Sequence, residues 1–408
     1  MAVTLGDDAA GSAEIRVDED EALDFAVRLV SIRSVDEPGV SDEHEATELV
    51  LAKMREWGWR PELVEVVPGR SNIIVDVPGG GPSGPVLAFE GHLDVVTEGD
   101  ASEWSQDPFG AAIVDGRLYG RGAADMKAGV VSMLYGVRAL QQAGPFPGTI
   151  RILALVDEEG MMLGAKHAVS SGALEGVAGV IICEPEGDEV CPVSKGAIRL
   201  RIDLIGQMTH AAMPERGRNA LPALGRILGM LGESERDLQA RYGTHPHLGT
   251  TYVTPTVVVA GTPAQMNTIS PRSSLWVDIR SIPGVDHDEL IARIRREAVA
   301  LAAADGVVVE VTVIDNRPPV DTSVDEPVVK CLVDAHTRVT GSVPAWGGVP
   351  GTTDGTIFTR DAMVPTVVYG PGGKWIAHQV DEFVEVEAIG RYARVYATAA
   401  LSFLSGAC

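Results

Sequence analysis

Residues Phe89 to Val96 read Phe-Glu-Gly-His-Leu-Asp-Val-Val, and the rest of the chain is best interpreted around them. The apolar run Val86 to Phe89 is short and ends near Gly91, which predicts a strand buried on both faces. His92 and Asp94 are two residues apart, so the period of a strand places both side chains on one face. An imidazole with a carboxylate beside it suits a metal ligand and its orienting partner. Taken alone, the pair favours a structural histidine near a surface aspartate, so the interpretation depends on residues farther along the chain.

Length and composition limit the classes of protein to consider. The chain has 408 residues, which is too long for one ordinary core and predicts two domains. Hydrophobic residues make up 45% and charged residues 22%, as is typical of a soluble globular protein. The formal net charge is -24, from 33 basic and 57 acidic residues. This balance argues against binding to nucleic acid or to an anionic membrane, because both require basic surface.

No stretch approaches the roughly 18 consecutive apolar residues of a membrane span. The N-terminal stretch Met1 to Glu21 is acidic and polar and lacks the basic-then-apolar pattern of a signal peptide, so we expect a cytoplasmic location. The cysteines are widely spaced and form no Cys-x-x-Cys pair, which favours free thiols over disulfides or a thiolate metal site. They are Cys183, Cys191, Cys331 and Cys408.

Acidic residues follow several further apolar segments in the first half of the chain. The predicted strand 148–156 ends on Asp157-Glu158-Glu159, and the predicted strand 177–183 runs directly into Glu184. Asp125 lies where a helix over 126–142 is predicted to begin. Strand, helix and strand with acidic residues at the strand ends predict an α/β fold, with a mostly parallel sheet flanked by helices and a site at its carboxyl edge.

The pattern changes at about residue 197. Ile198 to Ile205 alternates apolar with charged residues, as expected of a strand with one face in solvent. The order strand, helix, strand, strand, helix, strand over 197–314 predicts a smaller α+β domain inserted into the larger one. Residues 1–196 and 315–408 then form the catalytic metal-binding domain.

Five positions at strand ends or in loops carry the side chains that a pair of divalent ions requires. Two histidines, terminal carboxylates and one carboxylate shared by both ions form such a set. Glu158 points differently from its neighbour and is available as a general base. Each residue alone has an ordinary alternative, such as a surface glutamate pair, a turn or a helix cap. Together these alternatives are weaker. The five residues are His92, Asp125, Glu159, Glu184 and His378.

At these residues the sequence resembles the two-metal amidohydrolases that include acetylornithine deacetylase, succinyl-diaminopimelate desuccinylase, the aminoacylases and glutamate carboxypeptidase. The resemblance covers nearly the whole chain, in order and at plausible spacing. Its motifs are Gly91 to Asp94, Gly120 to Lys127, Asp157 to Glu159, Cys183 to Pro185, Lys195-Gly196, Gly206 to His210 with Asn219, Asn267, Asp278 to Arg280, and Gly370 to Gly372 through His378 to Glu382.

The resemblance implies how the metal ligands are divided. His92 and Glu184 would hold one ion, Glu159 and His378 the other, and Asp125 would bridge both. Glu158 would be the general base, and Asp94 would clamp the ring of His92.

The resemblance also implies that the inserted domain is a lid that dimerises. His210 would reach the neighbouring subunit's site and stabilise the oxyanion, and Asn267 and Arg280 would grip the substrate's carboxylate. The residues support Arg280 independently, because a guanidinium pairs with a carboxylate through two hydrogen bonds and this arginine ends an apolar strand. An arginine that extends from a sheet edge is the alternative. Gly351 and Thr352 resemble the family's loop beside the substrate, although a tight turn would read the same way.

We therefore expect a homodimeric hydrolase that cleaves an amide bond of an N-acyl amino acid or small peptide bearing a free carboxylate. Its cofactors would be two divalent ions, zinc first, with cobalt or manganese also suited to such ligands. One alternative is a hydrolase that removes an amino group from an unusual amine with the same metal site. The other is a non-catalytic binding protein of the same fold, against which the complete set of ligands argues.

Overall fold

The computed structural model describes residues 15–35 and 43–408, so most of the N-terminal stretch Met1 to Glu21 lies outside it. The chain divides into two compact units. Unit 1 comprises Met1–Pro192, Thr322–Gly348 and Thr353–Cys408, and unit 2 comprises Val193–Asp321 and Val349–Thr352. These junctions differ by a few residues from the sequence-based boundaries at 196 and 314.

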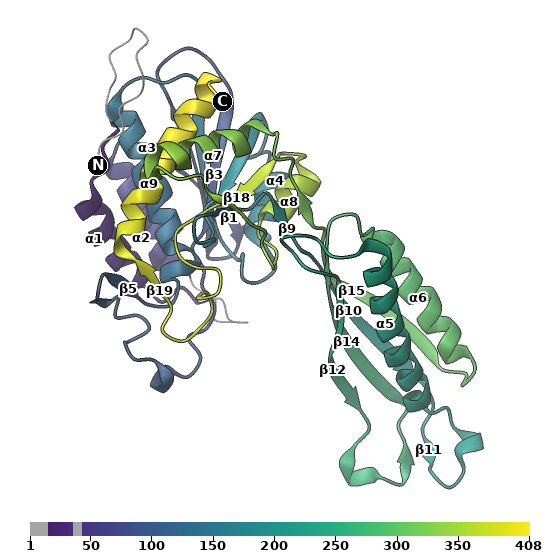
Figure 1. Cartoon of the computed structure of the whole chain (residues 1–408). Helices are drawn as coiled ribbons and strands as arrows, with labels where there is room; N and C mark the ends of the chain where they lie inside the picture. The colour runs from purple at the N-terminus through teal and green to yellow at the C-terminus, as the bar shows by residue number, and fades with distance from the viewer. Residues whose placement is uncertain (1–14, 36–42) are drawn as a thin grey trace. The chain divides into compact units, whose positions relative to one another are not determined.

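A largely parallel sheet forms the centre of unit 1 (Figure 1). In spatial order its strands are β1 (Glu62–Val67), β2 (Arg70–Pro78), β6 (Thr149–Leu155), β3 (Val86–His92), β7 (Val177–Ile182) and β18 (Thr366–Val368). The last four of these are mutually parallel, whereas β2 is antiparallel to both of its neighbours. The predicted fold class is therefore confirmed.

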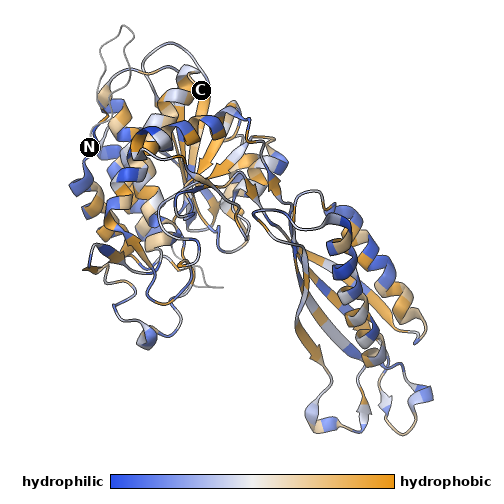
Figure 2. Ribbon diagram, viewed as in Figure 1, coloured by the Kyte–Doolittle hydropathy of each residue, from blue (hydrophilic) through white to orange (hydrophobic). Residues whose placement is uncertain are grey.

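Helices cover both faces of this sheet. One core is closed by α1 (Glu19–Val30), α2 (His44–Glu56), α3 (Ala128–Ala143), α7 (Pro327–Thr340) and α9 (Val386–Ser405). The shorter α4 (Leu163–Ser170) and α8 (Gly355–Asp361) contact each other and lie outside that core, against the other face. Figure 2 shows the strands as largely hydrophobic and the outer sides of the helices as hydrophilic. Because helices cover both faces, the strands read as continuous apolar runs.

Local signals set the ends of these helices. The Asp18 side chain accepts a hydrogen bond from the Glu21 backbone N–H at 3.0 Å and caps α1. Pro327 occupies the first turn of α7, and Gly341 ends that helix in the left-handed conformation that glycine adopts freely. None of the helices in the described part of the chain combines the length and the hydropathy that crossing a bilayer requires.

The expectation for the cysteines was wrong for one pair. Cys331 and Cys408 form a disulfide with their Cα atoms 5.3 Å apart, across a sequence separation of 77. Cys331 lies on α7 and Cys408 follows α9, and these two helices pack against each other. The pairing depends on that long-range packing, which cysteine spacing does not encode. Cys183 and Cys191 are free and buried, as expected.

Unit 2 is a four-stranded antiparallel sheet with two helices. Its strands are β12 (Tyr252–Ala260), β14 (Arg272–Ser281), β10 (Gly196–Ile205) and β15 (Val308–Arg317), in that spatial order, and its helices are α5 (Ala220–Tyr242) and α6 (His287–Ala303). Ile198, Leu200 and Ile202 are buried in a second core, whereas Arg199 and Arg201 between them are not. The alternation in the sequence thus reports a sheet covered on one face.

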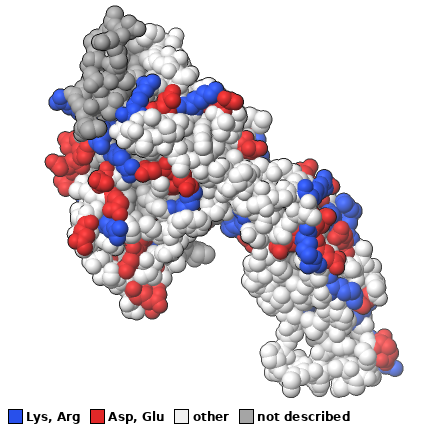
Figure 3. Space-filling model, viewed as in Figure 1, with Lys and Arg blue, Asp and Glu red and all other residues white. Residues whose placement is uncertain are grey.

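The edge strand β12 of unit 2 exposes unusually apolar side chains. Val257, Val258 and Val259 are 48%, 49% and 58% exposed, and Tyr252 is 46% exposed. In Figure 3 the charged side chains of unit 2 gather over its helices, and the surface over β12 carries few of them. An exposed apolar edge strand is a template for pairing with another chain.

Candidate active site

The predicted metal ligands gather at the carboxyl edge of the unit 1 sheet. His92 is the last residue of β3, Glu159 follows β6 and Glu184 follows β7. The parallel register sets His92 opposite Leu155 and Glu90 opposite Ile182, so the three strand exits are neighbours. His378 reaches the same edge from the loop after β18. Ligand sites at this edge are a general property of parallel α/β sheets.

Asp125 lies between the two histidines. Its Oδ1 atom is 3.3 Å from His92 Nε2, and its Oδ2 atom is 3.1 Å from His378 Nε2. His92 Nε2 is also 3.4 Å from Glu184 Oε1, and His378 Nε2 is 2.9 Å from Glu159 Oε1. The structure therefore brings together all five predicted ligands, with one oxygen of Asp125 toward each half of the set.

The donor set fits a pair of divalent ions. One potential ligand atom each from His92, Asp125 and Glu159 lies within 4.8 Å of the others, and the same holds for His92, Glu158 and Glu184. Within residues 15–35 and 43–408, His92 Nε2 and Asp125 Oδ1 are buried atoms that make no hydrogen bond. Burying polar atoms without partners is costly, and a metal ion would remove that cost.

The electrostatics of the cluster favour positive charge. Burial tends to raise the pKa of Asp125, but the imidazoles of His378 and His92 beside it lower that pKa well below its usual range. Hydrogen bonds to Asp125 and Glu159 raise the pKa of His378 to about 11. A cation of any kind is therefore stabilised among these carboxylates, as a divalent ion would be.

Glu158 has the environment of a general base. Its side chain is buried, and burial raises its pKa well above the usual range. The positive charge of His92 opposes that rise in pKa, and the carboxylates of Glu184 and Asp354 reinforce it. A carboxylate with a raised pKa accepts a proton more readily.

Asp94 acts on two neighbours at once. Its backbone carbonyl lies 2.9 Å from His92 Nδ1, whereas its carboxylate is 3.6 Å from that nitrogen. The carboxylate instead accepts the backbone N–H groups of Glu158 at 3.2 Å and Glu159 at 3.0 Å. The orienting contact on the His92 ring thus comes from the main chain of Asp94, and the side chain fixes the loop that carries the predicted base.

Sequence reasoning missed the residues that support this loop from below. Arg70 Nη1 donates to Asp157 Oδ1 at 2.8 Å and its Nε donates to Glu43 Oε1 at 3.0 Å. Asn72 accepts the Val156 N–H at 3.2 Å, and its amide donates to the Gly164 carbonyl at 2.9 Å. The partners in these contacts are far apart in the sequence, so no local sequence pattern predicts them.

Glu382 supports Asp125 in a similar way. Its Oε1 accepts the backbone N–H groups of Ala124 at 2.9 Å and Asp125 at 3.0 Å, and its other oxygen pairs with Arg121. All of these groups except Asp125 are fully buried. Glu382 belongs to a motif of the family resemblance, and that motif was the available signal for it.

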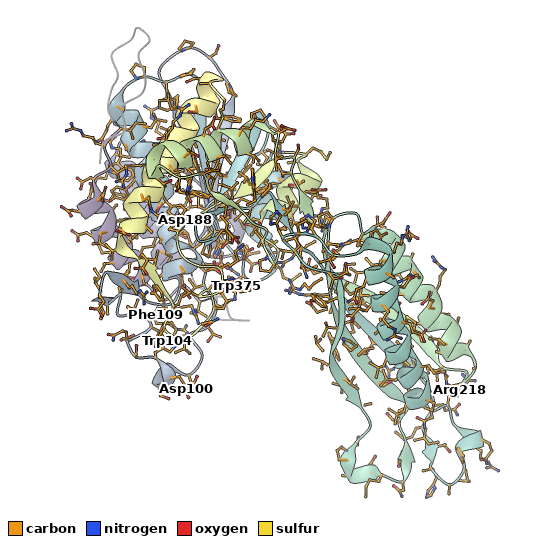
Figure 4. All side chains as sticks on the ribbon, viewed as in Figure 1. Asp100, Trp104, Phe109, Asp188, Arg218 and Trp375 are labelled. Atoms are coloured by element: carbon orange, nitrogen blue, oxygen red, sulfur yellow. A yellow bond between two sulfur atoms is a disulfide. The ribbon has the colours of Figure 1, made fainter. Side chains whose placement is uncertain are left out.

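The predicted substrate residues lie in unit 2 at two separate places. His210 pairs with Thr268 between β11 (Thr209–His210) and β13 (Thr268–Ile269), and the Ala211 N–H donates to the Asn267 carbonyl at 2.8 Å. His210 and Asn267 are therefore close neighbours. His210 is exposed, and its Nδ1 accepts the Ala212 N–H at 3.0 Å. Arg218, labelled in Figure 4, lies near this end of the unit.

Arg280 lies at the opposite end of β14 from Arg272, which is the end nearer Asn267. Eight residues of extended strand separate positions 272 and 280 by roughly 26 Å. Arg280 faces Ala197 and Tyr252 across the sheet, and its Nε donates to Asp278 at 2.7 Å. One chain thus does not bring Arg280 to His210 and Asn267.

Gly351 and Thr352 belong to the short segment that groups with unit 2. Thr352 Oγ1 lies 3.4 Å from Arg317 Nη1, and Arg317 is paired with Ala197 in the sheet, as Arg280 is. The structure therefore places Thr352 and Arg280 at the same end of unit 2. Their predicted contact with substrate stays a prediction.

Comparisons with known proteins show the family to which the chain is related. Residues 88–402 match the family described as Peptidase family M20/M25/M40. Succinyl-diaminopimelate desuccinylase of Rhodospirillum centenum is 33% identical over 336 residues, covering 80% of this chain and 83% of that protein.

Two solved structures share the fold. An M20 family metallo-carboxypeptidase from Sulfolobus solfataricus superposes with a TM-score of 0.76 at 19% identity and covers 95% of this chain and 100% of its own. A dinuclear metal-binding M20 peptidase from Bacillus subtilis has a TM-score of 0.71 at 20% identity, with coverage of 95% and 98%. At such identities the likeness speaks for the fold alone.

Proposed function

This chain belongs to peptidase family M20/M25/M40, and on that premise we propose that it is a two-metal hydrolase of N-acyl amino acids or small peptides that bear a free carboxylate. That it is a metal-dependent amidohydrolase follows from the family. The observation that carries the proposal for the site is the position of Asp125, with one oxygen toward each histidine. A shared carboxylate between two His/carboxylate sets is typical of a dinuclear centre.

We propose His92, Asp125 and Glu184 as ligands of one ion and Asp125, Glu159 and His378 as ligands of the other. When bound, such ions supply Lewis-acid chemistry and lower the pKa of a water molecule. Zinc suits this mixture of imidazole and carboxylate ligands, and cobalt and manganese suit it as well.

In the proposed mechanism Glu158 performs both proton transfers. Its buried carboxylate accepts a proton from the attacking water, holds it while the carbonyl carbon becomes tetrahedral, and then donates it to the leaving nitrogen. Asp94 keeps Glu158 in place through its bond to the Glu158 N–H. No other proton carrier is required, because the proton leaves and returns through one side chain.

The residues of unit 2 complete the proposal. His210 would donate a hydrogen bond to the developing oxyanion. Arg280 would bind the free carboxylate of the substrate, and Asn267, Gly351 and Thr352 would add polar contacts. The distance between His210 and Arg280 along the sheet supports the idea that one site takes them from two copies of the chain.

A homodimer formed through unit 2 is part of this proposal. The exposed valines of β12 would be covered if that edge paired with a second copy, and antiparallel pairing of identical edges gives a closed two-fold interface. Size-exclusion chromatography with light scattering tests this, and a monomer at micromolar concentration would contradict it.

A cytoplasmic location is the remaining part of the proposal. The Cys331–Cys408 disulfide argues against this location, since reducing compartments keep thiols reduced. Reduced Cys331 and Cys408 thiols in cells quenched with an alkylating agent would support a cytoplasmic location, because the bond would then have formed only after lysis in air. Mass spectrometry of the alkylated peptides checks this, and a bonded pair in quenched cells would indicate an oxidising compartment.

The central test of the function is a substrate panel measured with the metal content of the same protein. We expect hydrolysis of at least one N-acetyl amino acid, N-succinyl amino acid or dipeptide, lost on chelation and restored by zinc, cobalt or manganese. Identification of the leaving group separates amide cleavage from removal of an amino group. A protein that binds two ions and cleaves no member of the panel would contradict the proposed substrate class.

A further inference from the structure

A largely buried lysine, Lys374, lies at the centre of an acidic cluster in the segment that follows Glu184. Glu186, Glu189 and Cys191 follow β7, and a potential ligand atom of each lies within 4.8 Å of the others. Lys374 Nζ lies 2.5 Å from Glu186 Oε2, 2.7 Å from Glu189 Oε2 and 3.9 Å from Cys191 Sγ. The cluster resembles a third metal site in composition, but the ammonium group already provides its cation.

These contacts join three segments of unit 1. Besides the two carboxylates, Lys374 Nζ donates to the Gly348 carbonyl at 3.2 Å. The segment that contains Gly348 is packed closely, because a Cβ added to Gly347 would lie 2.1 Å from Glu189 Oε2 and 2.7 Å from Cys191 Sγ. Lys374 therefore ties its own loop both to the segment after Glu184 and to the segment at 346–348.

Burial of these charged side chains costs desolvation free energy, so their presence needs a structural or functional explanation. Glu186 is 4% exposed and Cys191 is 1% exposed, and the side chains of Lys374 and Glu189 are 12% and 37% exposed. Buried ion pairs contribute little net stability, because desolvation offsets their attraction. They do fix geometry, since an ammonium group held by two carboxylates and a carbonyl has few alternative positions.

The loop that Lys374 fixes carries His378. Hydrogen bonds from Ile376 N–H to the Gly373 carbonyl at 2.9 Å and from Gln379 N–H to the Ile376 carbonyl at 3.2 Å form successive turns between the two residues. Trp375, labelled in Figure 4, lies within these turns and is 72% exposed. On its far side the loop is held by Asp381, whose carboxylate accepts the Ser105 N–H at 2.7 Å.

His378 depends on such support more than the other candidate ligands do. Its φ angle is 65°, a left-handed conformation that a residue with a Cβ atom adopts only when its surroundings hold it. Its side chain is 49% exposed, whereas the side chains of Asp125 and Glu159 are 12% and 10% exposed. It also lies well beyond the end of its strand, so the sheet does not position it directly.

We propose that Lys374 is a positioning residue that, through Glu186 and Glu189, holds the His378 loop in the conformation that completes one of the two metal positions. It touches neither substrate nor metal. This inference rests on the proposed function, because it presupposes two ions, and it assigns the Lys374 cluster selectively to the ion held by Glu159 and His378.

The test compares Lys374→Met with Lys330→Met, which removes an exposed lysine from α7 in the same unit. Cobalt(II) is titrated into metal-free protein while heat and visible absorption are recorded. Wild type and Lys330→Met should bind two equivalents. Lys374→Met should bind the first equivalent with near wild-type affinity and the second at least about tenfold more weakly, with a spectrum altered only in the second phase. Excess cobalt should restore turnover.

Each outcome decides between the possible roles. Wild-type affinity of Lys374→Met for both equivalents would overturn the inference. An equal loss of affinity for both equivalents would also overturn it. A wild-type protein that binds fewer than two equivalents would instead overturn the proposed function. Should Lys374→Met fail to fold, Glu189→Gln takes its place, since it removes the negative charge of one of the two carboxylates that hold the ammonium group. A wild-type second phase in that variant would equally contradict the inference.

Discussion

The metal-centre edge of unit 1 and the end of unit 2 where β11 pairs with β13, here named the hairpin end, carry chemically similar residues in opposite environments. The side chains of His92 and Asp125 are 1% and 12% exposed, and the His92 Nε2 atom is buried without a hydrogen bond among the described residues. His210 is exposed, and its ring already accepts a local backbone N–H. Burial of His92 without a hydrogen bond opposes folding, whereas the exposed His210 does not.

This difference in burial distinguishes a site that one chain assembles by itself from one that it leaves incomplete. Burial of unpaired imidazole and carboxylate atoms opposes folding, so its presence points to a ligand that compensates. An exposed histidine gives no such indication. We therefore infer that unit 1 carries a preassembled metal centre and that the hairpin end of unit 2 becomes functional only against a second copy.

The largest expected effect on turnover comes from the general base of unit 1, Glu158. Glu158→Gln removes the proton carrier but keeps the size of the side chain, so turnover should fall by about 10³-fold, within the range usual for a general base. Metal content, measured by mass spectrometry of the dialysed protein, should stay as in wild type. Glu103→Gln changes an exposed glutamate of the same unit and serves as the control. Normal turnover in a fully metallated Glu158→Gln protein would contradict the role.

A smaller effect should come from the hairpin end. His210→Ala removes a donor to the oxyanion, and such losses lower kcat by about 10²-fold or somewhat more. KM and metal content should change little, because His210 is not a ligand in this account. The matched variant is His247→Ala, an exposed histidine of unit 2. A His210→Ala protein that lost metal would erase the distinction between the two regions.

Arg280→Ala tests the other end of unit 2. Loss of a charge-assisted hydrogen bond to the substrate's carboxylate should reduce kcat/KM by about 10- to 100-fold, which corresponds to ~1.5–3 kcal/mol. The decrease should appear mainly in KM and should vanish for a substrate amide that lacks the carboxylate. Arg241→Ala, at a side chain that is 59% exposed, is the control. An equal loss with both substrates would refute carboxylate binding.

The smallest effect on activity should follow loss of the disulfide. Cys408→Ser removes the bond between Cys408 and Cys331. The kcat of this variant should stay within about twofold of that of the oxidised wild type, since α7 and the chain end support the core and not the site. The unfolding free energy of unit 1 should fall by about 2–4 kcal/mol. Hydrogen exchange measured by peptide should show faster opening in unit 1 and no change in unit 2. Equal loosening of both units would indicate that they unfold together.

The sequence predicted the clustering of the candidate ligands better than it predicted the residues that support them. His92, Glu159 and Glu184 follow apolar runs that form neighbouring parallel strands, so strand order alone brings them together. Arg70 reaches Asp157 across the sheet, and nothing near either residue encodes that pair.

Unit 2 shows the same limit. Its strands and helices follow from alternation and helical spacing, but the separation of His210 from Arg280 depends on how β11, β13 and β14 fold back on one another. The Cys331–Cys408 pair depends in the same way on the packing of α7 against α9.

Mixing two inactive variants tests the central claim most directly. Glu158→Gln and His210→Ala proteins are combined, dissociated and allowed to reassociate, and hydrolysis is compared with each alone. A site that takes Glu158 from one copy and His210 from the other is intact once in every mixed dimer. Random pairing should then restore about a quarter of wild-type activity. Activity that stays at the level of the separate variants, although mass spectrometry shows mixed dimers, would contradict the claim that the hairpin end of unit 2 acts in a second copy.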